Sequence, residues 1–183
     1  QHISDRVLRA MNRHGGGALI RSVIEKLRRE IPDLTLRTTV IAGFPGETEE
    51  EFEELCAFVK ETKFDRFGAF AYSAEEGTAA AAFEGQLDEQ QKQDRCDALM
   101  RIQLAVSEEL LKKKIGAKIE VLCEGFDAAS GVYFGRSRAD APDVDGKVYF
   151  TAEKKIAEGR FVQVEVTEAL DYDLFGRALE GVQ

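Results

Sequence analysis

The sequence predicts an α/β unit followed by a small all-β unit, and two observations support this. Between Leu34 and Tyr72, two stretches rich in Val, Ile, Thr and Phe flank a helical pattern. Strand, helix and strand in that order form the crossover unit of a parallel sheet. After Gly116 the apolar period changes from about 3.6 to 2, which is typical of several short strands. We place the first unit at residues 1–115 and the second at residues 116–183.

Helical patterns surround the two expected strands. Ser4 is a good cap for a short first helix that ends near Gly15, and the glycines at 15–17 predict a flexible break. A second helix follows, with apolar residues at helical spacing, and ends at Pro32. A long helix is expected from about residue 88 to residue 114, where its lysines meet the negative end of the helix dipole.

The junction between the first strand and the crossover helix is the segment most typical of a ligand site. Its sequence, Gly43-Phe-Pro-Gly-Glu-Thr48, follows a buried strand, and parallel α/β enzymes bind ligands beyond the carboxyl ends of strands. Thr48 and Glu51 form a capping box, and Pro45 stiffens the turn. From spacing alone, a cofactor-lining turn and a plain capped turn are equally well supported.

Composition excludes several classes of protein. The 183 residues are 44% hydrophobic, enough for one large domain or two small ones. We find no signal peptide and no apolar run long enough to span a membrane. Cys56, Cys96 and Cys123 are far apart, so we expect a reducing cytoplasm and neither a disulfide framework nor a metal-cluster motif. Because the chain starts at Gln1 and two parallel strands leave a sheet edge open, we expect a fragment of a longer protein.

Charge gives a weaker indication. The net charge of -9 argues mildly against a strong nucleic-acid binder. Residues 117–183 carry eight Lys/Arg against thirteen Asp/Glu, a net charge of -5. An acidic surface favours a basic partner, although ordinary solubility explains the same charge and is the better interpretation of charge alone.

A loop in the second unit is the other candidate site. It spans residues 135–146 and contains Arg136, Arg138, Asp140, Asp143 and Asp145. Such a loop can recognise a partner or pair its own charges, and the residues alone favour internal pairing. Residues 171–176 place two acids among aromatic residues and could close the barrel or touch a partner. His2 and His14 have no partner at ligand spacing, so we assign them no acid–base or metal role.

Several segments resemble the methylthiotransferase family of radical S-adenosylmethionine enzymes. They are Gln1-His-Ile-Ser4 with Ala10-Met-Asn-Arg13, Arg37-Thr-Thr-Val-Ile-Ala-Gly-Phe-Pro-Gly-Glu-Thr48 and Phe70-Ala-Tyr-Ser-Ala-Glu-Glu-Gly-Thr78. The loop 135–146 and the ending Tyr172-Asp-Leu-Phe-Gly176 look like the RimO-type branch, which modifies an aspartate on protein twelve of the small ribosomal subunit. The resemblance implies that residues 1–115 are the C-terminal part of a radical-SAM partial (β/α) barrel. Residues 116–183 would then be an antiparallel, OB-like TRAM β-barrel.

The same resemblance implies a function for the complete protein. It would transfer a methylthio group to the aspartate β-carbon, using S-adenosylmethionine and two 4Fe-4S clusters. The cluster ligands would lie upstream, so we expect this chain alone to hold no cluster, to be inactive and to contain no catalytic or metal-binding residue. Its partner would be the basic ribosomal protein, in the cytoplasm, with nucleic acid secondary and no membrane. The alternatives are a MiaB-like tRNA adenosine methylthiotransferase with an RNA-binding TRAM domain and, for the isolated chain, a non-catalytic substrate-binding module.

The resemblance also implies site residues. The expected cofactor-binding residues are Gln1, Ser4, Arg37, Gly43, Phe44 and Glu47. Gln1 and Ser4 would lie near the ribose and methionine parts, and Arg37 would point from its strand toward the same pocket. The turn from Gly43 to Glu47 would pack near the adenine. The charged residues of the loop 135–146 would bind the substrate protein, because a net negative barrel suits a basic partner.

Overall fold

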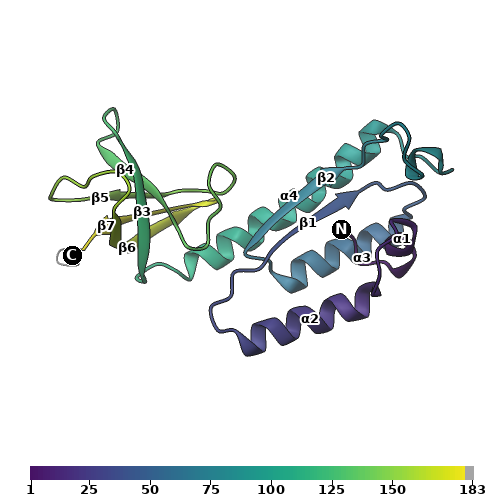
Figure 1. The fold of residues 1–183 in the computed structure, drawn as a ribbon, viewed down its shortest axis with the longest axis horizontal. Helices are drawn as coiled ribbons and strands as arrows, with labels where there is room; N and C mark the ends of the chain where they lie inside the picture. Colours follow the sequence, from purple (N-terminus) through teal and green to yellow (C-terminus); the bar gives the residue numbers. More distant parts are fainter. Residues whose placement is uncertain (180–183) are drawn as a thin grey trace. The chain divides into compact units, whose positions relative to one another are not determined.

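The computed structural model describes residues 1–179 and divides the chain into two compact units (Figure 1). One unit consists of residues 1–106 and the other begins at Ser107. Each has its own hydrophobic core. No helix within the described residues has the length and apolar character needed to cross a lipid bilayer.

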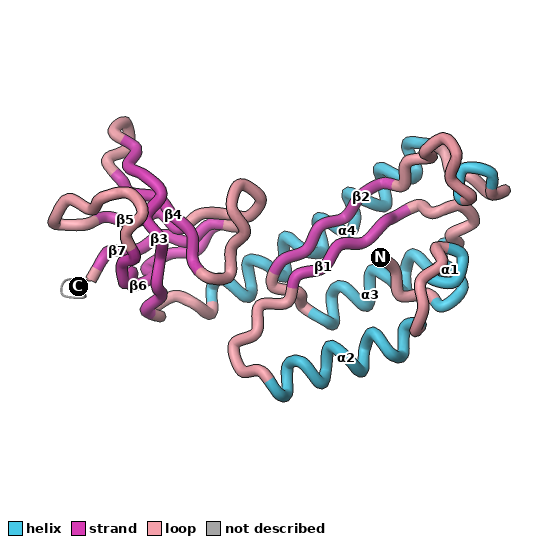
Figure 2. The backbone as a smooth tube through the Cα atoms, in the orientation of Figure 1, coloured by secondary structure: helices cyan, strands magenta, loops and turns pink. Residues whose placement is uncertain are grey.

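The first unit is a parallel strand pair covered by helices. Its elements are α1 (Asp5–Ala10), α2 (Gly16–Glu30), β1 (Arg37–Ala42), α3 (Glu49–Thr62), β2 (Arg66–Ala71), the 3₁₀ helix η1 (Ala80–Ala82) and α4 (Glu89–Lys112), whose last turns lie in the second unit. Figure 2 shows β1 and β2 side by side. Their parallel register runs from Arg37 opposite Arg66 to Ala42 opposite Ala71, which confirms the predicted strand–helix–strand order.

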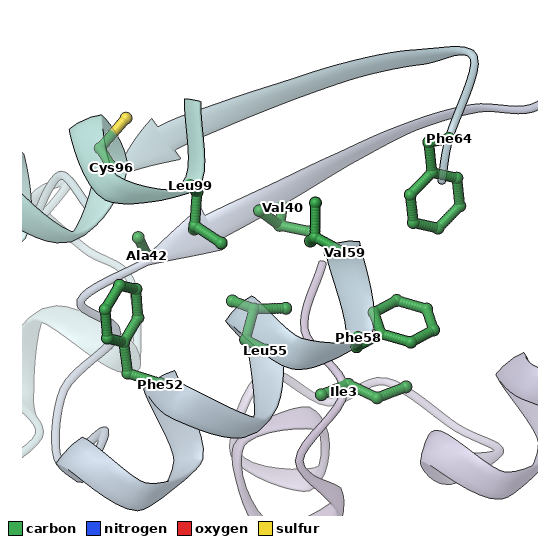
Figure 3. Close-up of a cluster of buried hydrophobic side chains, with 10 residues drawn as sticks. All are labelled: Ile3, Val40, Ala42, Phe52, Leu55, Phe58, Val59, Phe64, Cys96 and Leu99. Carbon is green, nitrogen blue, oxygen red and sulfur yellow. The ribbon is translucent and has the colours of Figure 1, made fainter. Parts of the chain in front are cut away.

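The core of this unit lies between one face of the sheet and the helices. Figure 3 shows side chains from β1, α3 and α4 meeting there, with Ile3 from the first segment of the chain. On α3 the buried residues recur at helical spacing, because one stripe of the helix faces the sheet. Leu55 and Val59 on α3 and Leu99 on α4 are fully buried.

The prediction of a flexible glycine break is wrong. Gly16 and Gly17 belong to the first turn of α2, and Gly15 is its N-cap residue. The Gly17 N–H donates to Asp5 Oδ1 at 2.7 Å, and a Cβ on Gly17 would lie only 2.4 Å from the carbonyl oxygen of Ile3. Glycine at position 17 therefore allows a close approach between α2 and the first segment of the chain.

The second unit is a closed five-stranded barrel. Its strands are β3 (Lys118–Asp127), β4 (Val132–Ser137), β5 (Val148–Thr151), β6 (Phe161–Leu170) and β7 (Asp173–Ala178), in the ring order β3-β4-β5-β7-β6. The expected barrel is therefore present, and β7, which contains part of the segment 171–176, closes it. Inward residues such as Val121, Val164 and Phe150 form the core, which Leu111 near the end of α4 joins.

The expectation of a purely antiparallel barrel needs one correction. The pair β5–β7 is parallel, with Val148 opposite Leu174, whereas the other four pairs are antiparallel. The reason is geometric. In a closed ring of five strands, directions cannot alternate all the way round, so at least one neighbouring pair must run in the same direction.

Candidate functional site

The carboxyl ends of β1 and β2 meet at one edge of the sheet. The N–H of Tyr72, just after β2, donates to the carbonyl of Ala42 at the end of β1, at 2.9 Å. The ring of Phe44 packs edge-on against Tyr72, with centroids 5.3 Å apart, and against Phe83, with centroids 6.1 Å apart. Three aromatic residues far apart in the sequence thus line the edge where parallel sheets bind ligands.

The turn from β1 to α3 needs glycine at two positions. Gly43 has φ 74° and Gly46 has φ 75°, both in the left-handed region that glycine adopts without strain. A Cβ on Gly43 would also lie 2.7 Å from Cγ and 3.1 Å from Cα of Lys92 on α4. The turn is followed by the predicted capping box, in which Thr48 and Glu51 bond each other's backbone N–H groups.

Glu47 is the buried centre of the turn. Its side chain has no exposed surface, and both carboxylate oxygens lie 3.1 Å from the N–H of Gly43. Oε2 lies 3.2 Å from Nε2 of His2, and Oε1 accepts from Nη1 of Arg95 at 2.6 Å. Burial alone would raise the pKa of Glu47, but the hydrogen bonds from His2, Arg95 and Gly43 outweigh it and lower that pKa below the usual value.

The contacts of His2 define its tautomer. The backbone N–H of Ser4 donates to Nδ1 at 3.0 Å, so Nδ1 is an acceptor and carries no proton. Nε2 is therefore the ring nitrogen that donates a proton to Glu47. His2 thus links the first segment of the chain to the turn after β1.

Ser4 belongs to a second network on the outer side of the turn. Its hydroxyl donates to Glu51 Oε1 at 2.7 Å and accepts from the N–H of Val7 at 3.3 Å, which confirms it as the cap of α1. Arg6 binds the Glu51 carboxylate and also donates to the Gly46 carbonyl at 2.6 Å. The hydrogen bond from Arg6, with further bonds from the Thr48 N–H and the Ser4 hydroxyl, lowers the pKa of Glu51 to about 2 despite partial burial.

The structure brings most of the expected cofactor-binding residues to this edge, but not all. Ser4, Gly43, Phe44 and Glu47 are connected there through the contacts above. Gln1 is exposed, and its carbonyl accepts from the Ile41 N–H at 2.9 Å, beside β1.

Arg37 lies at the far end of β1 from the turn. It is exposed at the first residue of β1, at the opposite end from Gly43, and six strand residues span about 20 Å. Because side chains alternate along a strand, Arg37 lies on the same sheet face as Ile41, opposite the face that packs against α3 and α4. Its expected role toward the cofactor stays a prediction.

The barrel loop uses much of its charge internally. The Asp140 carboxylate accepts from the N–H of Ser137 at 2.9 Å and from its hydroxyl at 2.6 Å. Asp145 accepts from the N–H of Ala141 at 2.6 Å. Arg136 forms an ion pair with Glu124 on β3. Asp143 is exposed at the loop tip beside Val144, whose relative exposure is 74%, and Arg138 is also exposed.

The turn can offer a ligand only certain kinds of contact. The N–H groups of Gly43, Gly46, Glu47 and Thr48 all donate to acceptors within this chain. An anion therefore finds no ready cradle of backbone donors here. The carbonyls of Phe44, Gly46 and Glu47 also accept hydrogen bonds within the chain, so the edge offers a ligand chiefly the partly exposed ring of Phe83. Within residues 1–179, no three His, Cys, Asp or Glu side chains come together to hold a metal ion.

Two residues of this site carried no signal in the sequence. Arg95 lies in the middle of a polar stretch of α4 and looks like any solvated helical arginine. Lys92, one turn earlier, is 3% exposed, with its ammonium over the Tyr72 ring and 2.7 Å from Glu89 Oε1. His2 has no partner at ligand spacing in the sequence, because Glu47 is 45 residues away. Only the fold brings these groups together.

Comparison with known proteins gives matches in both units. Residues 1–59 match the radical SAM superfamily, and residues 115–179 match the TRAM domain. The chain is 49% identical over 177 residues to a protein of Alkaliphilus oremlandii named ribosomal protein uS12 methylthiotransferase RimO. Proteins with the same name are 50% identical in Caldanaerobacter subterraneus subsp. tengcongensis and 47% identical in Pelotomaculum thermopropionicum.

These similarities cover 96% to 98% of this chain but only 40% of each relative. The chain thus spans about two fifths of the length of the curated relatives it matches. The resemblance seen in the motifs is confirmed: the chain matches the radical SAM superfamily and the TRAM domain, and along nearly its whole length it is similar to proteins named ribosomal protein uS12 methylthiotransferase RimO.

Proposed function

We propose that this chain is the C-terminal part of an enzyme that attaches a methylthio group to the β-carbon of an aspartate on ribosomal protein uS12. The supporting observation is that the chain, over 96% of its length, is 49% to 50% identical in sequence to proteins named ribosomal protein uS12 methylthiotransferase. In this proposal residues 1–115 complete a radical-SAM partial barrel and residues 116–183 are its TRAM domain. The TRAM match, which starts at residue 115, supports this boundary. Such an enzyme would work in the cytoplasm.

Two features of the sheet support the partial barrel. The Ile41 N–H on β1 donates to the Gln1 carbonyl on the side away from β2, so the segment containing Gln1 already runs beside β1. A further strand leading into that segment would extend the sheet. The sheet face opposite α3 and α4 carries Phe70, whose relative exposure is 64%. An exposed phenylalanine on a sheet face suits the inner wall of a larger barrel.

The edge beyond β1 and β2 fits part of an S-adenosylmethionine molecule. Phe44 and Tyr72 are buried, so the ring that can offer apolar surface to a base is that of Phe83, which is 37% exposed and packs against Phe44. Glu47 accepts the Gly43 N–H and so holds the turn in shape, and Ser4 donates to Glu51 of the capping box that follows it. Bound beside a reduced cluster of the complete enzyme, the cofactor would supply the radical that removes a hydrogen from the aspartate.

The iron–sulfur clusters do not fit residues 1–179. Within these residues Cys56, Cys96 and Cys123 do not come together with other possible ligands, and burial raises the pKa of each thiol, that of Cys56 to about 11. In our proposal the ligands of both clusters lie in the part of the complete enzyme outside this chain, and the isolated chain does not cleave S-adenosylmethionine.

The barrel loop 135–146 is our proposed contact for the basic ribosomal protein. The contacts of Asp140 and Asp145 hold the loop in shape, which leaves the exposed tip at Asp143 and Val144, with Arg138, as the surface that a partner can reach. The net charge of -5 in residues 117–183 favours a basic partner over a nucleic acid.

The reaction is tested with the complete protein, S-adenosylmethionine, a reductant and purified uS12. We expect mass spectrometry to find one methylthio group on a uS12 aspartate. A methylthio group on a tRNA adenosine, with uS12 unchanged, would establish the MiaB-like alternative instead.

Docking is tested with Asp143→Asn, and Glu158→Gln serves as a control because Glu158 is also an exposed acid of the barrel. We expect weaker uS12 binding for Asp143→Asn alone, by about 3-fold, and less difference at high salt. Equal binding by both variants and the unchanged protein would refute the loop contact.

A further inference from the structure

Glu47 is held by two side chains that neither the motifs nor the comparisons single out. We propose that His2 and Arg95 are positioning residues for S-adenosylmethionine: they fix the carboxylate of Glu47 and, through it, the shape of the turn from Gly43 to Glu47. This inference rests on the proposed function, in which that turn lines the cofactor pocket.

The carboxylate of Glu47 is held at both oxygens. Arg95 donates to Oε1 at 2.6 Å, His2 donates to Oε2 at 3.2 Å, and the Gly43 N–H lies 3.1 Å from each oxygen. Rotation of the carboxylate would break the His2 and Arg95 bonds together. The Gly43 N–H, which starts the left-handed part of the turn, would then lose its acceptor inside a buried site, at a cost in free energy.

The two side chains reach Glu47 from different parts of the fold. His2 lies on the segment that also holds Ser4, and its Nδ1 accepts the Ser4 N–H at 3.0 Å. Arg95 lies on α4, with its guanidinium 5.0 Å from the centre of the Phe52 ring, and donates also to the Glu47 carbonyl at 3.1 Å. Glu47 therefore fixes the spacing between the segment 1–4 and the turn, which are the two expected walls of the pocket.

Arginine at position 95 does more than supply a positive charge. One guanidinium contacts the Glu47 carboxylate, the Glu47 carbonyl and Glu49 Oε2, the last at 2.9 Å. A lysine donates from a single point and can keep only part of this set. The side chain is 13% exposed, so little water is available to replace the lost bonds. The dissociation constant of S-adenosylmethionine for Arg95→Lys should therefore lie between those of the unchanged protein and Arg95→Met.

The test uses the complete protein and measures the dissociation constant of S-adenosylmethionine by calorimetry, beside the KM, the kcat and the melting temperature. Arg95→Met should raise the dissociation constant and the KM by about 10-fold or more, and Arg95→Lys by about 3-fold. The kcat at saturating cofactor should stay within about 2-fold, because these groups do not touch the reacting atoms. Arg101→Met, an exposed arginine on the same helix, should change neither constant.

Two further variants separate positioning from general packing. His2→Asn can keep the bond to the Ser4 N–H but is too short to reach Glu47, so it should weaken binding. The smaller side chain also lowers the melting temperature, so binding is measured well below that temperature, where the variant is fully folded. In a cycle with Glu47→Gln, the double variant with Arg95→Met should bind no more weakly than the weaker single variant, because both changes disable the same group.

The outcomes are distinct. If the unchanged protein binds S-adenosylmethionine and His2→Asn and Arg95→Lys bind it equally well, the positioning role is refuted although the proposed function stands. Losses of binding that add in the cycle refute it too, because Arg95 would then act independently of Glu47. If the unchanged complete protein does not bind S-adenosylmethionine, the proposed function fails first and this inference fails with it.

Discussion

Arg95 and Glu47 are 48 residues apart in the sequence, yet Nη1 of Arg95 lies 2.6 Å from Oε1 of Glu47 at the edge of the parallel sheet. The pair is nearly closed to water, with the Glu47 side chain fully buried and that of Arg95 13% exposed. Breaking a buried pair by removing one charge leaves the other uncompensated, which costs far more than losing a surface pair. The turn therefore depends on a residue of the distant helix α4.

The first prediction concerns the pH dependence of stability. Because the pKa of Glu47 is lowered in the folded chain, its carboxylate stabilises the fold above the ordinary glutamate value of 4.5, and this contribution is lost as the pH falls through the lowered value. Glu47→Gln should reduce the free energy of unfolding by about 3 kcal/mol at neutral pH. Urea titrations should show this difference shrinking at acid pH. Glu54→Gln, an exposed change on α3, should differ little from the unchanged chain at any pH.

The sequence predicted those parts of the fold that local patterns determine. The capping box at Thr48 and Glu51, the cap at Ser4 and the parallel strand pair follow from residue type and spacing, and all are present. The glycine break was wrong because a contact between Gly17 and Ile3, not chain flexibility, explains a glycine there. The parallel pair β5–β7 follows from ring closure, which no single segment encodes.

The candidate site was predicted less completely than the fold. The turn from Gly43 to Glu47 was identified, because a strand end, glycines and a cap are visible in one short segment. The burial of Glu47 against His2 and Arg95 was not, because both contacts span more than 40 residues of chain. A buried hydrogen-bond network is a property of tertiary packing, and only the structure reveals it.

The second prediction concerns the outer network of the turn. Arg6, Ser4 and the Thr48 N–H lower the pKa of Glu51 to about 2, so its stabilising contribution should fade as the pH falls from about 4.5 to about 2. Glu51→Gln should cost about 1 kcal/mol at neutral pH, since the Arg6 side chain is 51% exposed and water screens the pair. Raising the salt concentration should reduce this loss in urea titrations. A loss that salt does not change would show that the capping bonds, and not the Arg6 charge, carry the effect.

The third prediction compares two glycines on strands. A Cβ on Gly135 in β4 would lie 2.1 Å from the carbonyl oxygen of Leu122, a backbone atom that cannot move without disturbing the pairing of β3 and β4. Gly135→Ala should therefore destabilise the barrel by at least about 2 kcal/mol. A Cβ on Gly68 in β2 would meet only Thr39 Oγ1, at 4.0 Å. Gly68→Ala should be tolerated, and thermal unfolding of both variants tests the contrast.

The last prediction concerns two tyrosine hydroxyls with opposite surroundings. The Tyr72 hydroxyl is buried and has no hydrogen-bond partner among residues 1–179, whereas its ring packs against Phe44 and lies under the Lys92 ammonium. Removing an unsatisfied buried hydroxyl while keeping the ring is expected to raise stability, so Tyr72→Phe should increase the free energy of unfolding by about 1 kcal/mol.

Tyr133 gives the matched control, because its hydroxyl accepts the Ile156 N–H at 3.2 Å. Tyr133→Phe should leave that donor without its partner and lower stability by about 1 kcal/mol. Urea unfolding of the two variants should thus give changes of opposite sign. A clear loss of stability in Tyr72→Phe would mean that its hydroxyl makes a hydrogen bond in solution. The carboxyl edge of the sheet would then contain a polar partner, such as an ordered water, within reach of Phe44 and Lys92.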